Sequence, residues 1–272
     1  SLAAGGTETV QRWAEEVWLE IPEAVFWGPY MKEDMNAIIQ VKKDLEKQAG
    51  DRVTFTLIRQ LSGAGVTGDA TMEGGEEAMT WYSDSVTIDQ RRNAVRLAGK
   101  MTEKRPAFDL RTNAKQLLKD WLAALIDTHI FTQITTSPTR AVYGGDAVST
   151  ATIENGDFFT LALMTRAKTV ARKAVPQIFP VKIMGGEYFL CVIAPDCIHD
   201  LKNSDSNWAQ AQREAQERGS SNPLFTGAEG IWDQVVIRSS TRVPLTTNWG
   251  SGSNLNGAEN VFCGRQAVVC AW

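Results

Sequence analysis

The residues with the most evident chemistry lie in one acidic, glycine-rich stretch, GVTGDATMEGGEEAMTW, at residues 65–81. Its carboxylates are Asp69, Glu73, Glu76 and Glu77, and neither lysine nor arginine accompanies them. Clustered carboxylates can bind a metal ion, transfer protons as a general acid and base, or give a surface the negative charge that attracts a partner. Glycines in such a loop can also cradle a phosphate group.

Metal and phosphate binding both fit this stretch poorly. Calcium loops follow D-x-[DN]-x-[DN]-G with a glutamate at the twelfth position, a spacing that these carboxylates lack. The pattern G-x-G-x-x-G does occur at Gly63, Gly65 and Gly68, but acidic residues that would repel phosphate follow it in place of a helix. Catalytic carboxylates need a concave, partly desolvated site, which a long solvent-facing loop does not offer. The stretch is best interpreted as an arm that reaches another molecule.

Cysteine and histidine usage argues against a metal centre. The cysteines are spaced C-x5-C and C-x6-C in apolar runs, so we expect buried, reduced thiols at Cys191, Cys197, Cys263 and Cys270. The only histidines are His129 and His199, and no G-x-S-x-G nucleophile motif is present. We therefore expect no catalytic residue, no cofactor and no metal. The 9 tryptophans favour core or interface anchoring over a sugar-binding surface.

Composition indicates a globular chain of 272 residues with a formal net charge of −4. That charge gives no basic footprint for nucleic acid, so we expect no sequence-specific binding of DNA. No apolar run approaches the roughly 20 residues that span a bilayer, and no secretory signal is visible. The apolar end AVVCAW predicts that the native polypeptide continues beyond Trp272, and Ser1 suggests that a methionine or a longer segment precedes it.

The elements that must position the acidic stretch begin with two amphipathic segments. TETVQRWAEEVWLEI at 7–21 and MKEDMNAIIQVKKDLEKQ at 31–48 both predict helices. DRVTFTLIRQL at 51–61 alternates with period 2, as a strand does, and a return run starts at SVTI, residues 85–88. The acidic stretch therefore closes a long two-stranded hairpin. Because an isolated two-stranded ribbon is only marginally stable in water, we expect this arm to pack against another protein surface.

The rest of the chain predicts an α+β fold. A long helix is expected over 108–134, with an apolar stripe at Leu110, Ala114, Leu117, Leu118, Trp121, Leu125 and Ile126. Helices are expected at 157–173, 197–203 and 207–218, and strands on either side of Gly185–Gly186, at 232–240 and at 260–272. Mixed helices and strands without βαβ periodicity indicate α+β.

Charge is separated along the arm. Acids run through its tip, with no base between residues 60 and 90. Cations follow immediately at the arm root, at Arg91, Arg92, Arg96, Lys100, Lys104 and Arg105. Such separation suits head-to-tail docking of one copy on another. We expect intersubunit contacts through the tip (Gly68, Asp69, Glu73, Glu76, Glu77, Trp81) and through the root (Arg91, Arg92, Arg96, Lys100, Arg105).

Several stretches resemble the major capsid proteins of tailed phages, in particular the N-four-like branch of coat proteins. They are GDRVTFTL (50–57), LSGAGVTGDATMEGGEE (61–77), AVRLAGKMTEKR (94–105), NPLFTGAEGIWDQVVI (222–237) and GRQAV (264–268). The resemblance implies the Hong Kong 97 fold. It also implies self-assembly, through hexamers and pentamers, into an icosahedral head shell around double-stranded DNA. The protein would then be a structural component of the virion, assembled in the host bacterial cytoplasm, with no enzymatic activity and no membrane association.

The resemblance also implies a division of the chain. It would comprise an N-terminal helical arm (1–50), an extended loop (51–105), a peripheral-domain spine helix (106–139), a mainly axial domain (140–260) and a return strand of the peripheral domain (261–272). The loop tip, residues 61–84, would overlap the neighbouring subunit. In NPLFTGAEG, Pro223, Gly227 and Gly230 would fix the backbone of a structured loop.

One departure from the wider fold concerns cross-linking. No lysine lies between Lys47 and Lys100, so a covalent isopeptide bond from the arm tip is not expected. Stability would come from non-covalent contacts or from decoration, scaffolding and portal proteins. Two other classes remain open from the residues: a soluble α+β enzyme with an unrecognised site, and a carbohydrate-binding decoration protein that uses exposed tryptophans.

Overall fold

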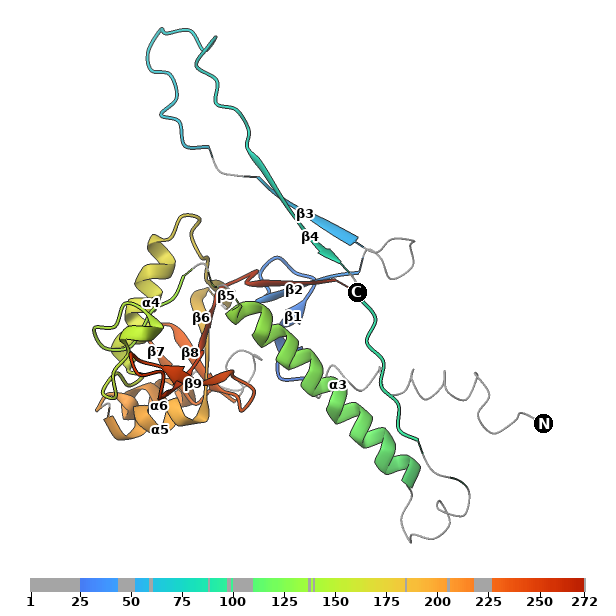
Figure 1. Cartoon of the computed structure of the whole chain (residues 1–272). Coiled ribbons are helices and arrows are strands. Elements are labelled where there is room, and N and C mark those ends of the chain that lie inside the picture. Colours follow the sequence, from blue (N-terminus) through green and yellow to red (C-terminus); the bar gives the residue numbers. More distant parts are fainter. Residues whose placement is uncertain are drawn as a thin grey trace, which may run out of the picture. The chain divides into compact units, whose positions relative to one another are not determined.

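The computed structural model describes residues 25–43, 52–58, 61–87, 89–96, 99, 110–136, 138, 140–183, 185–204, 206–217 and 227–271. The chain divides into two compact units (Figure 1). Residues 1–40 with 93–269 form the first unit, and residues 41–92 with 270–272 form the second. The helix expected at 7–21 lies outside the described residues, as do Pro223 and residues 44–50.

A five-stranded sheet forms the centre of the first unit. Its strand order is β11-β6-β8-β7, with β5 paired to β6 as well. The strands are β5 (Val181–Ile183), β6 (Gly186–Ile193), β7 (Gly230–Trp232), β8 (Val235–Ser239) and β11 (Val261–Cys263). β6 and β8 run parallel, and the side chains at Phe189, Leu190, Val235 and Ile237 are 0% exposed. Strands buried on both faces read as unbroken apolar runs, which is why YFLCVI and VVI were recognisable in the sequence.

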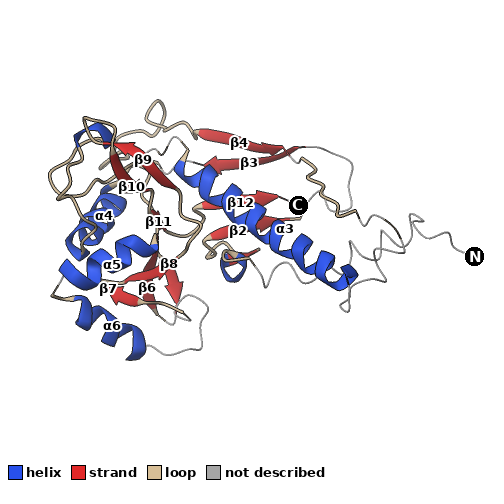
Figure 2. Ribbon diagram, turned by 60° about the horizontal axis from the view of Figure 1, so that its bottom comes forward, coloured by secondary structure: helices blue, strands red, loops and turns tan. Residues whose placement is uncertain are grey.

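Three helices accompany this sheet (Figure 2). They are α4 (Leu161–Lys173), α5 (Pro195–Ser204) and α6 (Trp208–Glu217), and they confirm the three helices expected in this half of the chain. The Thr160 side chain caps α4 by accepting a hydrogen bond from Leu163 N at 3.3 Å. At the start of α6, the Trp208 ring lies so close to Gly230 that an added Cβ would sit 3.3 Å from it.

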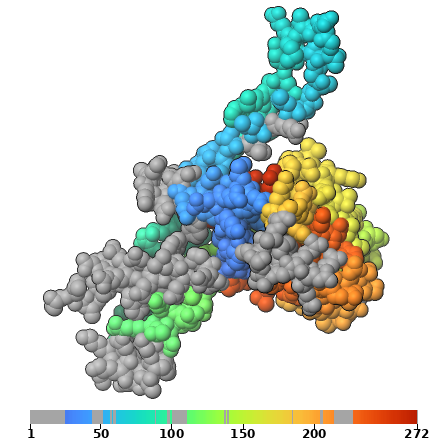
Figure 3. Space-filling model, turned by 180° about the vertical axis from the view of Figure 1, so that it is seen from behind, coloured from blue at the N-terminus to red at the C-terminus, as the bar shows by residue number. Residues whose placement is uncertain are grey.

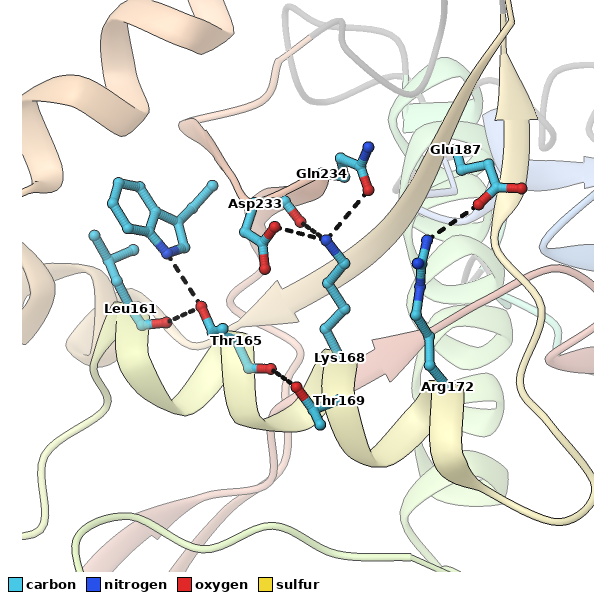
Figure 4. Close-up of polar contacts among 9 residues, drawn as sticks. Leu161, Thr165, Lys168, Thr169, Arg172, Glu187, Asp233 and Gln234 are labelled. Carbon is cyan, nitrogen blue, oxygen red and sulfur yellow. Dashed lines mark hydrogen bonds and ion pairs between the residues drawn. The ribbon is translucent and has the colours of Figure 1, made fainter.

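The strand expected at 232–240 is two strands, because a tight turn breaks it at Asp233 and Gln234. Both residues have positive φ, 46° and 63°, as a type I′ hairpin turn requires. Neither residue is glycine, and the side chain of a lysine on α4 forms hydrogen bonds with both of them (Figure 4). Lys168 Nζ donates to Asp233 O at 2.7 Å, to Asp233 Oδ1 at 2.6 Å and to Gln234 Oε1 at 3.2 Å. The strand expected at 260–272 is likewise split, into β11 and β12 (Val268–Ala271), by a turn with Gln266 at φ 52°.

A second hairpin, β9 (Leu245–Trp249) with β10 (Leu255–Ala258), was not predicted. Its strands are short, half exposed and rich in threonine, asparagine and glycine, so they carry little hydrophobic pattern. The Trp249 ring lies directly against the Gly257 backbone: a Cβ built at Gly257 would sit 1.9 Å from Trp249 Cε3.

Gly257→Ala is therefore expected to destabilise the first unit by about 1–3 kcal/mol, the usual cost of forcing a packed group aside. The measurement is the melting temperature of the unassembled protein. Gly156→Ala is the matched control, because a Cβ there meets nothing within 4 Å. Equal melting temperatures for the two variants would contradict the close packing of Trp249.

The long helix is present as α3 (Leu110–Thr135), but the expected apolar stripe is only partly its buried face. On that stripe Ala114 is buried and Leu117 is 63% exposed. The other buried residues, Ala123, Asp127, Ile130 and Phe131, were not part of the expected stripe. Phe131 packs in an aromatic cluster with the segment that precedes η1 (Gly28–Tyr30): its ring centroid is 6.2 Å from that of Phe26 and 5.2 Å from that of Trp27.

The helix expected at 31–48 is wrong over its described part. Residues 31–43 contain two strands, β1 (Met31–Lys32) and β2 (Ile39–Lys42), which form a three-stranded sheet in the order β1-β2-β12. The run Ile38, Ile39, Val41 is β-branched, and long-range pairing overrides its weak helical period. Asn36 ties the preceding loop to β5: its side chain donates to Lys182 O at 2.7 Å and accepts from Lys182 N at 2.9 Å.

The second unit contains the expected hairpin. β3 (Arg52–Ile58) and β4 (Trp81–Thr87) pair antiparallel, from Arg52↔Thr87 to Ile58↔Trp81. The return strand begins earlier than expected, at Trp81 in place of residue 85, and it ends at Thr87. Residues 89–96 have no regular secondary structure. In the space-filling view of Figure 3, the hairpin is narrow along its two strands and wider at the loop of residues 61–80. Among the described residues, no helix is long and apolar enough to cross a membrane.

Candidate intersubunit contact surface

Glu77 closes the loop at the hairpin tip. Its carboxylate accepts hydrogen bonds from Ser62 N at 2.8 Å, from Ser62 Oγ at 3.1 Å and from Gly63 N at 2.5 Å. The approach to Gly63 leaves no room for a side chain, because a Cβ there would lie 2.7 Å from Glu77 Oε2. Glu77 thus holds residues 62 and 77 together across the loop, a structural role that the sequence did not predict.

Glu76 also forms a hydrogen bond within the loop, whereas Asp69 and Glu73 do not. Glu76 Oε2 accepts a hydrogen bond from Gly74 N at 2.8 Å, beside a turn in which Gly75 N donates to Met72 O at 2.9 Å. Asp69, next to Gly68 at φ 67°, and Glu73 are exposed and make no hydrogen bond or ion pair with the other described residues. The tip therefore presents Asp69 and Glu73 to solvent, and these are its carboxylates available for a partner.

The hairpin also exposes large apolar side chains. Six of them are more than half exposed: Ile58 (52%), Leu61 (63%), Met72 (62%), Met79 (57%), Trp81 (58%) and Tyr82 (52%). Only Trp81 was singled out from the sequence. Of the others, Leu61, Met72 and Met79 could have been found, since large apolar residues are unusual in a solvated loop rich in glycine and acids. The tip is both acidic and apolar.

The basic root is described only in part. Arg91, Arg92 and Arg96 are exposed, and Arg92 Nη2 donates to the side chain of Gln90 at 2.5 Å. Lys100 and Arg105 lie outside the described residues. The root therefore offers at least three cations to solvent.

The side chains considered for other chemistry do not converge on a site. Within the described ranges, no three His, Cys, Asp or Glu side chains come together as metal ligands. His199 is 77% exposed at its side chain and contacts Asn203 one turn along α5. Trp27 and Trp208 are buried, and Trp81 alone among the six described tryptophans is mostly exposed. An exposed tryptophan surface for sugars is thus lacking in the described part of the chain.

The cysteines are free thiols, and three are buried as expected, at Cys191, Cys197 and Cys263. Cys270 is half-buried. Burial raises the pKa of the Cys263 thiol from 9.0 to about 12. Burial also raises the pKa of Cys191, and the neighbouring thiols of Cys263 and Cys197 raise it further. Such thiols stay protonated and unreactive near neutral pH.

Comparison with known proteins gives one consistent result. The family described as "Phage capsid protein" matches residues 1–143 and 134–272. The major capsid protein of Pseudomonas phage KPP25 is 26% identical over an alignment of 299 residues. The alignment covers 94% of this chain and 79% of that protein.

Two solved structures resemble the whole chain. The capsid of Ralstonia phage GP4 has a TM-score of 0.81 and 31% identity, covering 91% of this chain and 77% of the other. The capsid of cyanophage Pam1 has a TM-score of 0.69 and 26% identity, covering 90% and 78%. The likeness therefore extends well beyond the central sheet.

Proposed function

The chain belongs to the phage capsid protein family and is a major capsid protein of a tailed phage, and from this premise we propose how its copies hold one another. Its α+β architecture is that of the Hong Kong 97-like capsid fold. Capsid proteins of this kind assemble into a shell of many copies, so the protein is part of the virion. The alternative of a soluble enzyme has no support among its relatives.

We propose that the hairpin arm is the main intersubunit connector. The observation that carries this proposal is its exposed surface: six large apolar side chains and the carboxylates of Asp69 and Glu73 stand on a two-stranded ribbon. Such ribbons are only marginally stable alone, and exposed apolar patches usually mark a binding surface. A neighbouring copy that covers the arm would bury these side chains, and the cations of the root would complement the charge of a tip.

The division of the chain follows the same proposal. The N-terminal arm would be residues 1–50, the extended loop 51–105, the spine helix 106–139, the axial domain mainly 140–260 and the return strand 261–272. Support comes from the separate compact unit formed around residues 41–92 and from the length of α3.

The proposed assembly is a shell of hexamers and pentamers formed in the host bacterial cytoplasm. The net charge of −4 suits an inner face that contacts double-stranded DNA without sequence specificity. Since the arm tip has no lysine for a covalent cross-link, decoration, scaffolding and portal proteins are the proposed additional partners.

The first experiment is negative-stain microscopy with sedimentation of the protein expressed alone and together with the neighbouring structural genes of its phage. Shells, or rings of five or six subunits, are the expected result. A monomer under both conditions would overturn the proposed mode of assembly.

The arm-docking step is tested by Asp69→Lys/Glu73→Lys, which leaves the loop-closing Glu76 and Glu77 in place. Reversing two interfacial charges is expected to raise the protein concentration needed for assembly at least about tenfold, and more at low salt. Sedimentation velocity measures this concentration. The control is Asp146→Lys/Glu154→Lys, the same two residue types at exposed positions outside the arm. Equal assembly of both variants would contradict arm docking.

A further inference from the structure

A second exposed surface lies where α4 leads into β5, and we name it the 172–182 surface. It comprises Arg172, Lys173, Val175, Phe179 and Lys182. Val175 is 78% exposed and Phe179 is 48% exposed, although both belong to the unit with the large buried core. Apolar side chains left outside such a core are candidates for a contact with another molecule.

The loop that carries these side chains is held in place by three backbone contacts. Ile178 N donates to Ala171 O at 3.1 Å, and Arg140 Nη2 donates to Val175 O at 3.1 Å. Arg265 N donates to Phe179 O at 2.8 Å, and its guanidinium carbon lies 4.6 Å from the centre of the Phe179 ring. A pre-ordered apolar anchor loses little conformational entropy on binding, which favours its use as a hot spot.

The 172–182 surface is positively charged. Residues 158–186 contain no acid but carry Arg166, Lys168, Arg172, Lys173 and Lys182. Two of these cations are neutralised, Lys168 by Asp233 at 2.6 Å and Arg172 by Glu187 at 3.0 Å (Figure 4). Lys173 and Lys182 are exposed and have no ion pair with another described residue, and Arg140 adds a further charge beside Val175.

The chemistry of this surface mirrors that of the hairpin tip. Residues 60–90 contain no base, and the tip exposes Met72 and Met79 beside Asp69 and Glu73. The root supplies cations, but among residues 89–96 Val95 is the one large apolar side chain that is exposed, at 45%. The root therefore matches the charge of the tip without matching its apolar side chains, whereas the 172–182 surface matches both.

We propose that the 172–182 surface of one copy receives the hairpin tip of a second copy. This inference rests on the proposed function, because it names the receptor for the docking arm. Lys173 and Lys182 would face Asp69 and Glu73, while Val175 and Phe179 would contact the methionines. The tip and the receptor are different patches of the same chain, so the contact is heterologous. Repeated heterologous contacts produce a closed ring when the rotation between copies closes.

The test uses charge reversals on each side of the contact. One chain carries Asp69→Lys/Glu73→Lys and the other carries Lys173→Glu/Lys182→Glu. Each is expected to assemble poorly alone, requiring at least about tenfold more protein. When the two chains are co-expressed with different tags, each reversed tip meets a reversed surface. Alternation of the two chains satisfies every contact in a six-membered ring, so hexamers are expected to recover with both chains present in equal amounts.

Matched controls separate docking from general effects of charge and apolarity. Arg213→Glu reverses an exposed cation on α6, far along the chain from the surface. Val148→Ser is the control for Val175→Ser, because the two valines are 77% and 78% exposed. We expect Val175→Ser to weaken assembly severalfold and Val148→Ser to leave it unchanged. Circular dichroism of the unassembled variants checks that each one folds.

Four outcomes distinguish the ideas. Normal assembly of the tip variant would overturn arm docking and this inference with it. A defective tip variant with a Lys173→Glu/Lys182→Glu variant that behaves like Arg213→Glu would overturn only the receptor. Two defective variants that do not rescue each other would also overturn the pairing. Recovery on co-expression would support the contact between copies, because a contact within one chain cannot be rescued by another chain.

Discussion

Asp127→Ala is expected to lower the free energy of unfolding by roughly 3 kcal/mol, because it removes the buried acceptor that joins three segments. Asp127 is 0% exposed in the middle of α3. Its Oδ2 accepts hydrogen bonds from Phe26 N at 3.0 Å and from the Arg242 guanidinium, and its Oδ1 accepts one from Trp27 N at 3.3 Å. The substitution leaves two backbone donors and a partly buried cation without their partner. Arg242 is 32% exposed, so water recovers part of its solvation.

Urea unfolding of the unassembled protein, followed by tryptophan fluorescence, measures this loss, since Trp27 lies within the affected cluster. Asp120→Ala is the matched control: it lies on the same helix, is exposed and accepts one side-chain hydrogen bond, from Gln116 at 2.9 Å. Its effect should stay within about 0.5 kcal/mol. Asp127→Asn, which keeps one acceptor oxygen, should fall between the two. A midpoint for Asp127→Ala equal to that of Asp120→Ala would contradict the role of this carboxylate.

The importance of Asp127 was visible in the sequence but was not recognised. Ala123, Asp127, Ile130 and Phe131 repeat at the spacing of one helical face, so an acid stands in the middle of an apolar stripe. The face chosen from the sequence instead included Leu117, which is 63% exposed. Periodicity indicated the helix reliably, but it could not select the buried face without knowing which segments pack on it.

Elements dominated by local signals were predicted well. The β6 and β8 strands contain unbroken apolar runs, and α4 to α6 have clear periods and boundaries. Elements that depend on packing or pairing with segments distant in sequence were not predicted. Residues 39–42 form a strand because β1 and β12 lie on either side, and β9 with β10 depends on Trp249 packing on Gly257. The turn at Asp233 and Gln234 was missed because neither residue is glycine, the usual signal for positive φ, and because its side-chain partner Lys168 is 65 residues away in sequence.

The candidate site was predicted in composition but not in the division of its roles. All four tip carboxylates were identified from charge, yet the structure separates Glu76 and Glu77, which bind the loop itself, from Asp69 and Glu73, which face solvent. This separation requires atomic distances that spacing cannot provide. It also changes the experiment, because reversing Glu77 would open the loop and could not be attributed to docking.

Alkaline pH is expected to destabilise the protein through its buried thiols. The folded pKa of Cys263 is raised from 9.0 to about 12 by burial, and that of Cys191 is raised by burial and by its neighbouring thiols. The folded state therefore keeps protons that the unfolded state releases. The stability from each thiol is fully present below pH 9 and is lost as the pH rises from 9 towards the folded value. Each thiol should cost about 1.4 kcal/mol by pH 10.

Unfolding free energies of the wild type and of Cys191→Ala/Cys263→Ala, measured by urea titration at pH 8 and pH 10, test this dependence. The double variant loses packing at both pH values, but it should lose less stability than the wild type on going to pH 10, because neither buried proton remains. Tyr30, whose pKa is also raised by burial, contributes equally to both proteins and cancels in the comparison. Cys270→Ala, at a half-buried position, is the control and should change the pH dependence less. Parallel pH profiles for the wild type and the double variant would show that the two thiols do not carry the effect.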